Sequence, residues 1–130
     1  MLKEKLDEAT DKLFYISESD APVKPFTGGR AEAVTSGNLL KEIKTGSKNG
    51  SIEEITPAEF FEPLTKLRAG ASAQETEYAE RFDKIKNMLD ENLRDVKVFK
   101  VGDDYQKKVY IVGLDEEGNL TGVQTEATET

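Results

Sequence analysis

The chain has 130 residues, and its 26 acidic residues against 18 basic ones give it a net charge of −8 at neutral pH. It contains neither cysteine nor histidine, which excludes disulfides, thiolate or Ser-His-Asp catalysis, and metal sites built from these side chains. The length predicts a single domain over residues 1–130, and the acidity disfavours nucleic acid and anionic lipid as partners and favours a basic protein.

No apolar run approaches the roughly 20 residues that a membrane-spanning helix needs, so we expect no membrane segment. The N-terminal segment Met1–Glu8 carries charges in every turn and lacks the apolar core of a secretory signal. We therefore place the protein in the cytoplasm. We expect it to need no cofactor and to be a monomer when free.

The first predicted element is a helix that begins at Leu2 and ends near Tyr15. Its apolar stripe has the alternating spacing of four and three residues that one helix face requires. The stripe consists of Leu2, Leu6, Ala9, Leu13 and Ile16. The short polar residues 17–22, which end at a proline, predict an acidic loop, and residues 21–37 predict irregular structure with one short strand.

Residues 38–44 fit a short helix and a strand equally well. Residues 45–51 predict a turn, because Asn49-Gly50 is the dipeptide that best tolerates positive φ. A short strand is expected around residues 52–55.

Two capping signals predict where the next helices begin. Thr56 precedes a proline and is followed three residues later by Glu59, and Ser72 and Glu75 repeat the same spacing before the longest predicted helix. Residues 66–73 form the loop between the two helices. The expected buried faces are Phe60, Phe61 and Leu64 for the first helix, and Tyr78, Phe82, Ile85, Leu89 and Leu93 for the second.

The last third of the chain changes to the period of a strand. Residues 96–101, 109–112 and 120–125 are rich in β-branched and aromatic residues. They predict an antiparallel meander with turns at residues 102–104 and 115–119. Helices followed by strands predict an α+β domain in which helices pack on a sheet, without repeats or an internal linker.

Three small constellations admit a chemical interpretation beside a plain one. Glu18 and Asp20 could form a pair of catalytic carboxylates, but nothing nearby supplies the apolar pocket that would raise one pKa. Residues 28–30, Gly-Gly-Arg, could bind an anion, but no helix begins directly after them. Residues 115–119 offer alternating oxygen ligands, yet the glycine and distal glutamate of a calcium loop are misplaced.

The C-terminal residues 113–130 contain no lysine or arginine and end in a further carboxylate at Thr130. A solvated tail is the ordinary interpretation. Together with the loop at Glu18, however, the tail gives the molecule a second group of hard oxygens, of the kind that ligates Mg²⁺ or imitates phosphate.

Several segments, in the order in which they occur, resemble the nuclease A inhibitor family over nearly the whole chain. They are Leu13–Asp20, Phe60-Phe61, Phe82–Leu93, Val98–Gly102, Val109–Gly113, Gly118–Gly122 and Glu129-Thr130. The resemblance is most specific in the Ser-Glu-Ser loop and the C-terminal third. It implies a three-layer α-β-α sandwich of the pathogenesis-related-1-like type with an antiparallel sheet.

The resemblance also implies a function, which is non-covalent inhibition, in a 1:1 complex, of a bacterial, non-specific, Mg²⁺-dependent DNA/RNA endonuclease with a ββα-metal active site. The protein would then not be an enzyme. Glu18 and Thr130 match the family residues that enter the nuclease cleft and reach its catalytic Mg²⁺, directly or through water. The implied contact residues are Ser17, Glu18, Ser19, Asp20, Ala69, Gly70, Glu129 and Thr130.

One departure from the family concerns the loop before the long helix. Ala69-Gly70 stands where the family example has an acidic residue followed by tryptophan, and the chain contains no tryptophan. The departure indicates either a different nuclease or a changed role. The alternative function is a cytoplasmic interaction module of the same fold that binds a basic partner other than a nuclease. An enzyme using Glu18 and Asp20 ranks third and would need a closed apolar pocket around them.

Overall fold

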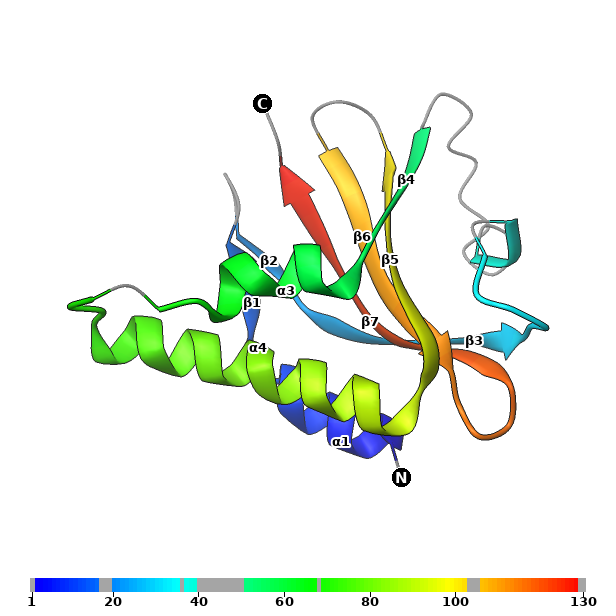
Figure 1. Cartoon of the computed structure of the whole chain (residues 1–130), viewed down its shortest axis with the longest axis horizontal. Coiled ribbons are helices and arrows are strands. Elements are labelled where there is room, and N and C mark those ends of the chain that lie inside the picture. Colours follow the sequence, from blue (N-terminus) through cyan, green and yellow to red (C-terminus); the bar gives the residue numbers. More distant parts are fainter. Residues whose placement is uncertain are drawn as a thin grey trace.

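The computed structural model describes residues 2–16, 20–35, 37–39, 51–67, 69–102 and 106–128 (Figure 1). The elements in chain order are α1 (Leu2–Thr10), β1 (Phe14–Ile16), β2 (Asp20–Pro22), β3 (Lys24–Arg30), β4 (Ser51–Ile55), α3 (Pro57–Thr65), α4 (Ala73–Asn92), β5 (Arg94–Gly102), β6 (Gln106–Leu114) and β7 (Asn119–Thr128).

The central element is a five-stranded antiparallel sheet with the strand order β3-β7-β6-β5-β4. The meander predicted for the last third of the chain, β5-β6-β7, is confirmed. Helices α1, α3 and α4 lie together on one side of the sheet (Figure 1). The α+β class is therefore confirmed, while the pathogenesis-related-1-like sandwich stays a prediction.

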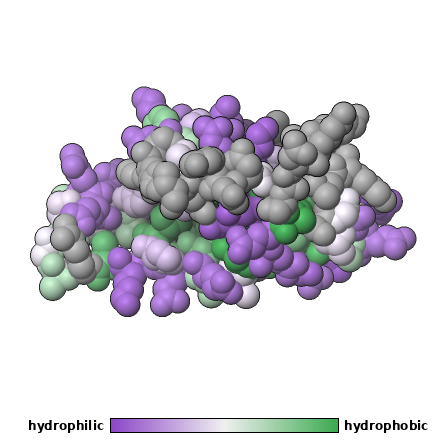
Figure 2. Space-filling view, turned by 90° about the horizontal axis from the view of Figure 1, so that it is seen from above, coloured by the Kyte–Doolittle hydropathy of each residue, from purple (hydrophilic) through white to green (hydrophobic). Residues whose placement is uncertain are grey.

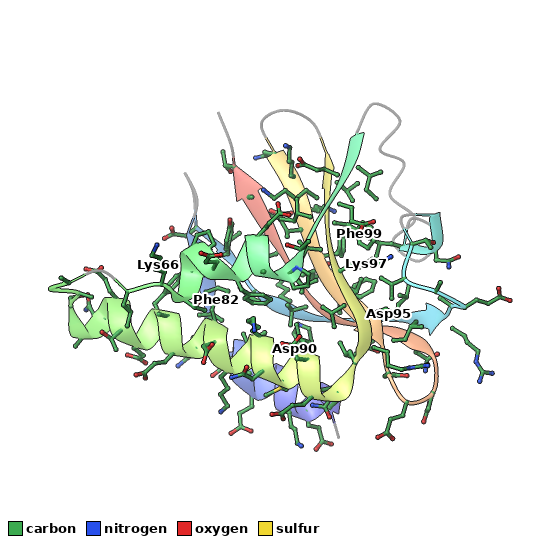
Figure 3. The ribbon with its side chains drawn as sticks, in the orientation of Figure 1. Lys66, Phe82, Asp90, Asp95, Lys97 and Phe99 are labelled. Atoms are coloured by element: carbon green, nitrogen blue, oxygen red, sulfur yellow. The ribbon has the colours of Figure 1, made fainter. Side chains whose placement is uncertain are left out.

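Both faces of the sheet are buried. On the helix side, Val109 and Ile111 of β6 pack in one core with Phe82 of α4, and on the other side Tyr110 and Val112 pack in a second core with Phe99 of β5. Phe82 and Phe99 accordingly lie on opposite sides of the sheet (Figure 3). A strand buried on both faces needs apolar residues at successive positions, which explains the unbroken apolar run of residues 109–112.

Both predicted helix starts are confirmed. The Thr56 hydroxyl accepts a hydrogen bond from the backbone N–H of Glu59 at 3.1 Å, and Ser72 Oγ accepts one from the N–H of Glu75, also at 3.1 Å. The Glu75 carboxylate accepts in turn from the N–H of Ser72, which completes a capping box. The predicted stripe of α4 is buried at Phe82, Ile85, Leu89 and Leu93 and half-buried at Tyr78.

The prediction that the first helix ends near Tyr15 is wrong, because α1 ends at Thr10 and residues 14–16 form β1. Lys12 adopts a left-handed conformation with φ of 55°, which stops the helix. Leu13 continues the helical stripe in sequence and is also buried in the observed fold, at 3% exposure. The stripe therefore did not distinguish a long helix from a short helix followed by a strand.

The loop predicted at residues 17–22 is wrong where β2 forms, whereas the short strand expected within residues 21–37 is confirmed as β3. β3 is an edge strand of the sheet, where Pro25 needs no ladder hydrogen bond from its nitrogen. Its register with β7 shifts between Thr27 and Arg30, at the two glycines, as expected of a bulge. The proline and the two glycines that suggested irregular structure are thus compatible with a strand at the edge of the sheet.

The other sequence predictions have mixed outcomes. Residues 37–39 are helical, the strand at 52–55 is β4, and the hairpin turn at 115–119 is confirmed. Of the turns predicted at 45–51 and 102–104, residues 45–50 and 103–104 lie outside the described residues, while Ser51 begins β4 and Gly102 ends β5. No helix in the described part of the chain is long and apolar enough to cross a membrane.

Gly122→Ala tests how tightly the central strands pack. A Cβ at Gly122 would meet the backbone carbonyl of Ile111 on β6, whereas a Cβ at Gly37 would meet no atom within 4 Å. We expect Gly122→Ala to lower the free energy of unfolding by about 2–3 kcal/mol through overpacking, as measured by urea denaturation. Gly37→Ala is the matched control, and an equal effect of the two substitutions would contradict this account.

Candidate functional site

The first component of the candidate site is the β1–β2 hairpin. Ile16 pairs with Asp20, and Ser17–Ser19 lie between these two residues in the sequence. These three residues, including Glu18, lie outside the described residues. The hairpin is held by the backbone N–H of Val23, which donates to the carbonyl of Leu13 at 2.9 Å.

β7 anchors this hairpin to the main sheet. The hydroxyl of Thr125, which is 5% exposed, donates a hydrogen bond to the carbonyl of Pro22 at 3.1 Å. On the inner side of the hairpin, Tyr15 stacks on Phe60 of α3 with ring centroids 5.5 Å apart. The loop that carries Glu18 thus begins and ends on strands fixed to both the sheet and a helix.

The second component is the C-terminal end of β7. A depression of about 230 Å³ lies between β2, β6 and β7. Its lining residues are Asp20, Ala21, Gln106, Lys107, Lys108, Glu126, Ala127 and Thr128. The fold therefore brings Asp20, which is exposed, close to Thr128, although they are far apart in sequence. Glu129 and Thr130, which follow Thr128 directly, lie outside the described residues.

Charges of both signs line this depression. Asp20 and Glu126 contribute negative charges and Lys107 and Lys108 positive ones, with Lys108 and Glu126 opposite each other on neighbouring strands. Burial of Tyr110, and then the negative charge of Glu126, raise the pKa of the Tyr110 phenol above its ordinary value of 10.0. The two lysines and Glu126 were not singled out from the sequence, because their convergence with Asp20 depends on strand pairing.

Ala69 and Gly70 lie elsewhere, in the exposed turn between α3 and α4. Gly70 has a φ of 79°, and no atom lies within 4 Å of where a Cβ would be. The turn projects at one end of the helices, apart from the end of β7 (Figure 1). Neither residue lines the depression, so the described candidate residues fall into two separate places.

The other constellations considered from the sequence have structural explanations. Asp115 Oδ1 accepts hydrogen bonds from the N–H groups of Glu117 and Asn119, and Oδ2 accepts one from the Thr121 hydroxyl. Arg30 pairs with β7 as part of a strand, which is not an anion site at a helix start. Among the described residues, no group of three or more acidic side chains could hold a metal ion.

The face seen from above Figure 1 is mainly hydrophilic among its coloured residues, with hydrophobic areas between them (Figure 2). A hairpin loop, a chain terminus and a charged depression can contact another protein. They do not provide the enclosed apolar pocket that usually holds a small-molecule substrate. The described part of this site is thus suited to contact with another protein.

Comparison with protein families agrees with this class. A family model described as nuclease A inhibitor-like protein matches residues 1–130, and the chain belongs to this family. Its members bind and inhibit a nuclease and are not enzymes. No curated protein matches the sequence.

The electrostatics of Tyr110 predict a loss of stability at high pH. The raised pKa means that the folded protein keeps the phenolic proton at pH values where the unfolded chain has lost it. The contribution of Tyr110 to stability is therefore complete below pH 10, where the unfolded phenol ionises, and is lost as the pH rises through the raised value in the fold. Tyr110→Phe cannot ionise and should lose less free energy of unfolding between pH 9 and pH 11. The free energy of unfolding of both proteins is measured by urea denaturation. An equal fall in the two between pH 9 and pH 11 would contradict this prediction.

Proposed function

We propose that the protein inhibits a non-specific, Mg²⁺-dependent DNA/RNA endonuclease by placing the Ser17–Ser19 loop and its C-terminus at the nuclease's catalytic metal. Family membership supports the nuclease as the partner. The observation that carries the mechanism is that Asp20 and Thr128 line one depression. Glu18 and Thr130 are each two residues from these positions, and two residues of chain span at most about 7 Å.

The chemistry of the proposed contact follows from the oxygen ligands that Mg²⁺ prefers. The carboxylate of Glu18 supplies hard oxygens where the scissile phosphate would bind. Thr130 supplies its hydroxyl and the terminal carboxylate of the chain. An inhibitor in this position and a nucleic acid substrate cannot occupy the cleft together, so inhibition is competitive.

Two further features favour rapid and tight binding. The net charge of −8 attracts the protein to a basic groove that has evolved to hold nucleic acid. The strand pairing of Ile16 with Asp20, together with the Thr125 hydrogen bond, fixes the ends of the loop before binding. Preorganisation lowers the conformational entropy that binding would otherwise cost.

Glu18→Ala tests the central contact. We expect the inhibition constant to rise at least about 30-fold, because truncating a desolvated charged anchor costs about 2–5 kcal/mol. The measurement is a titration of each protein into a ββα-metal nuclease from the same source, with plasmid cleavage as the readout. The wild type should stop cleavage near one-to-one stoichiometry.

Glu116→Ala is the matched control. It removes the same charge from an exposed side chain in the β6–β7 turn, at the opposite end of β7 from Thr128. We expect it to inhibit as well as the wild type. Full inhibition by Glu18→Ala would sink the mechanism, whereas failure of the wild type at large excess would favour an interaction module with another basic partner.

Deletion of Thr130 tests the second contact. It moves the terminal carboxylate one residue back along the chain, and we expect the inhibition constant to rise about tenfold or more. If Glu18 and Thr130 act at the same metal, the double variant should lose less than the sum of the two single losses in binding free energy. Strict additivity in this double-mutant cycle would count against a shared site.

A further inference from the structure

Phe14 is an aromatic residue whose position the core does not explain. Its side chain is 46% exposed, and it is the most exposed aromatic side chain among the residues that the structure describes. Its neighbour Tyr15 points the other way and stacks on Phe60. Successive strand residues face opposite sides, so β1 presents a phenylalanine outward where a polar residue would be expected.

Phe14 belongs to a small outward face of the hairpin. Its cross-strand partner is Pro22, which is also exposed, and Asp20 lies two residues from Pro22 on the same side of β2. Ala21 between them is buried. The face thus runs from an apolar pair, Phe14 and Pro22, to the carboxylate of Asp20 at the edge of the Glu18 loop.

The distance from this apolar pair to Glu18 suits a single interface. Glu18 comes four positions after Phe14 in the sequence, and four residues of chain span at most about 14 Å. A standard interface covers about 800 Å² of each partner, which corresponds to a patch of about 16 Å in radius. A partner that encloses the Glu18 loop at the centre of its contact will therefore reach Phe14.

A charged anchor gains from such an apolar neighbour. Ion contacts at an interface are strong only where water is excluded, and apolar groups around the anchor provide that exclusion. In the turn between α3 and α4, Ala69 and Gly70 stand where the family example has an acidic residue followed by tryptophan, so these two positions supply no large apolar anchor. Leu67, at the start of the same connection, lines the groove beside the turn and is, with Phe14, one of the two large hydrophobic side chains that are exposed among the described residues, each at 46%.

We propose that Phe14, with Pro22 beside it, is the apolar anchor of the nuclease contact and packs against the wall of the cleft that receives the Glu18 loop. This inference rests on the proposed function. It assigns the apolar contact to the hairpin and not to the helix turn, so the same element carries the charged and the apolar anchor.

The test uses Phe14→Ala and Phe14→Glu with the ββα-metal nuclease that the wild-type protein inhibits. We expect Phe14→Ala to raise the inhibition constant about 10- to 100-fold through faster dissociation, since apolar anchors act mainly on the dissociation rate. Phe14→Glu should dissociate as fast or faster, while its added negative charge leaves association unchanged or faster. Both variants should keep the wild-type melting temperature within about 2 °C, because Phe14 lies outside the core.

Leu67→Ala is the matched control, since it truncates a side chain of the same exposed fraction on the other surface. We expect less than about a threefold change in its inhibition constant. Wild-type inhibition by Phe14→Ala, or a larger loss in Leu67→Ala than in Phe14→Ala, would overturn the assignment while leaving the inhibitor function in place. If the wild-type protein inhibits no such nuclease, the proposed function and this inference fail together.

Discussion

The pairing of β6 with β7 is the constraint on which the rest of the structure depends. Its register is continuous from the turn at residues 115–119 to the end of the described chain, where Gln106 lies opposite Thr128. The two strands form the centre of the sheet, and apolar residues on both faces connect them to the helix-side core and to the second core. The end of β7 is therefore a rigid position, and Thr125 on that strand fixes the β1–β2 hairpin next to it.

This arrangement brings two pieces of chain that are remote in sequence close together, Asp20 of β2 and Thr128 at the end of β7. Since the β1–β2 hairpin is attached to β7 through Thr125, the sheet determines the geometry between Asp20 and Thr128. Binding then costs less conformational entropy than the ordering of two free segments would.

The turn at Ala69-Gly70 and the β1–β2 hairpin differ in the side chains that they expose. Gly70 leaves open space where a side chain would stand, and the exposed Leu67 lies nearby on the groove between α3 and α4. The hairpin, in contrast, combines acidic residues with the exposed ring of Phe14. The two large hydrophobic side chains that are exposed among the described residues therefore lie on separate surfaces, Phe14 beside the acidic Asp20 on the hairpin and Leu67 beside the helix turn.

The sequence by itself determined the features that depend on local chemistry. The caps at Thr56 and Ser72, the stripe of α4 and the three C-terminal strands follow from hydrogen bonding and periodicity within a short window, and the Ser-Glu-Ser loop and C-terminal segment gave the family. Tertiary structure decided the rest. Leu13 is buried whether it follows a long helix or a short one, so only the pairing of β1 with β2 shows where α1 ends. Pro25 and the glycines of β3 fit a strand only because that strand lies at an edge. The meeting of Asp20, Lys107 and Thr128 in one depression depends on long-range strand pairing, which no local pattern in the sequence records.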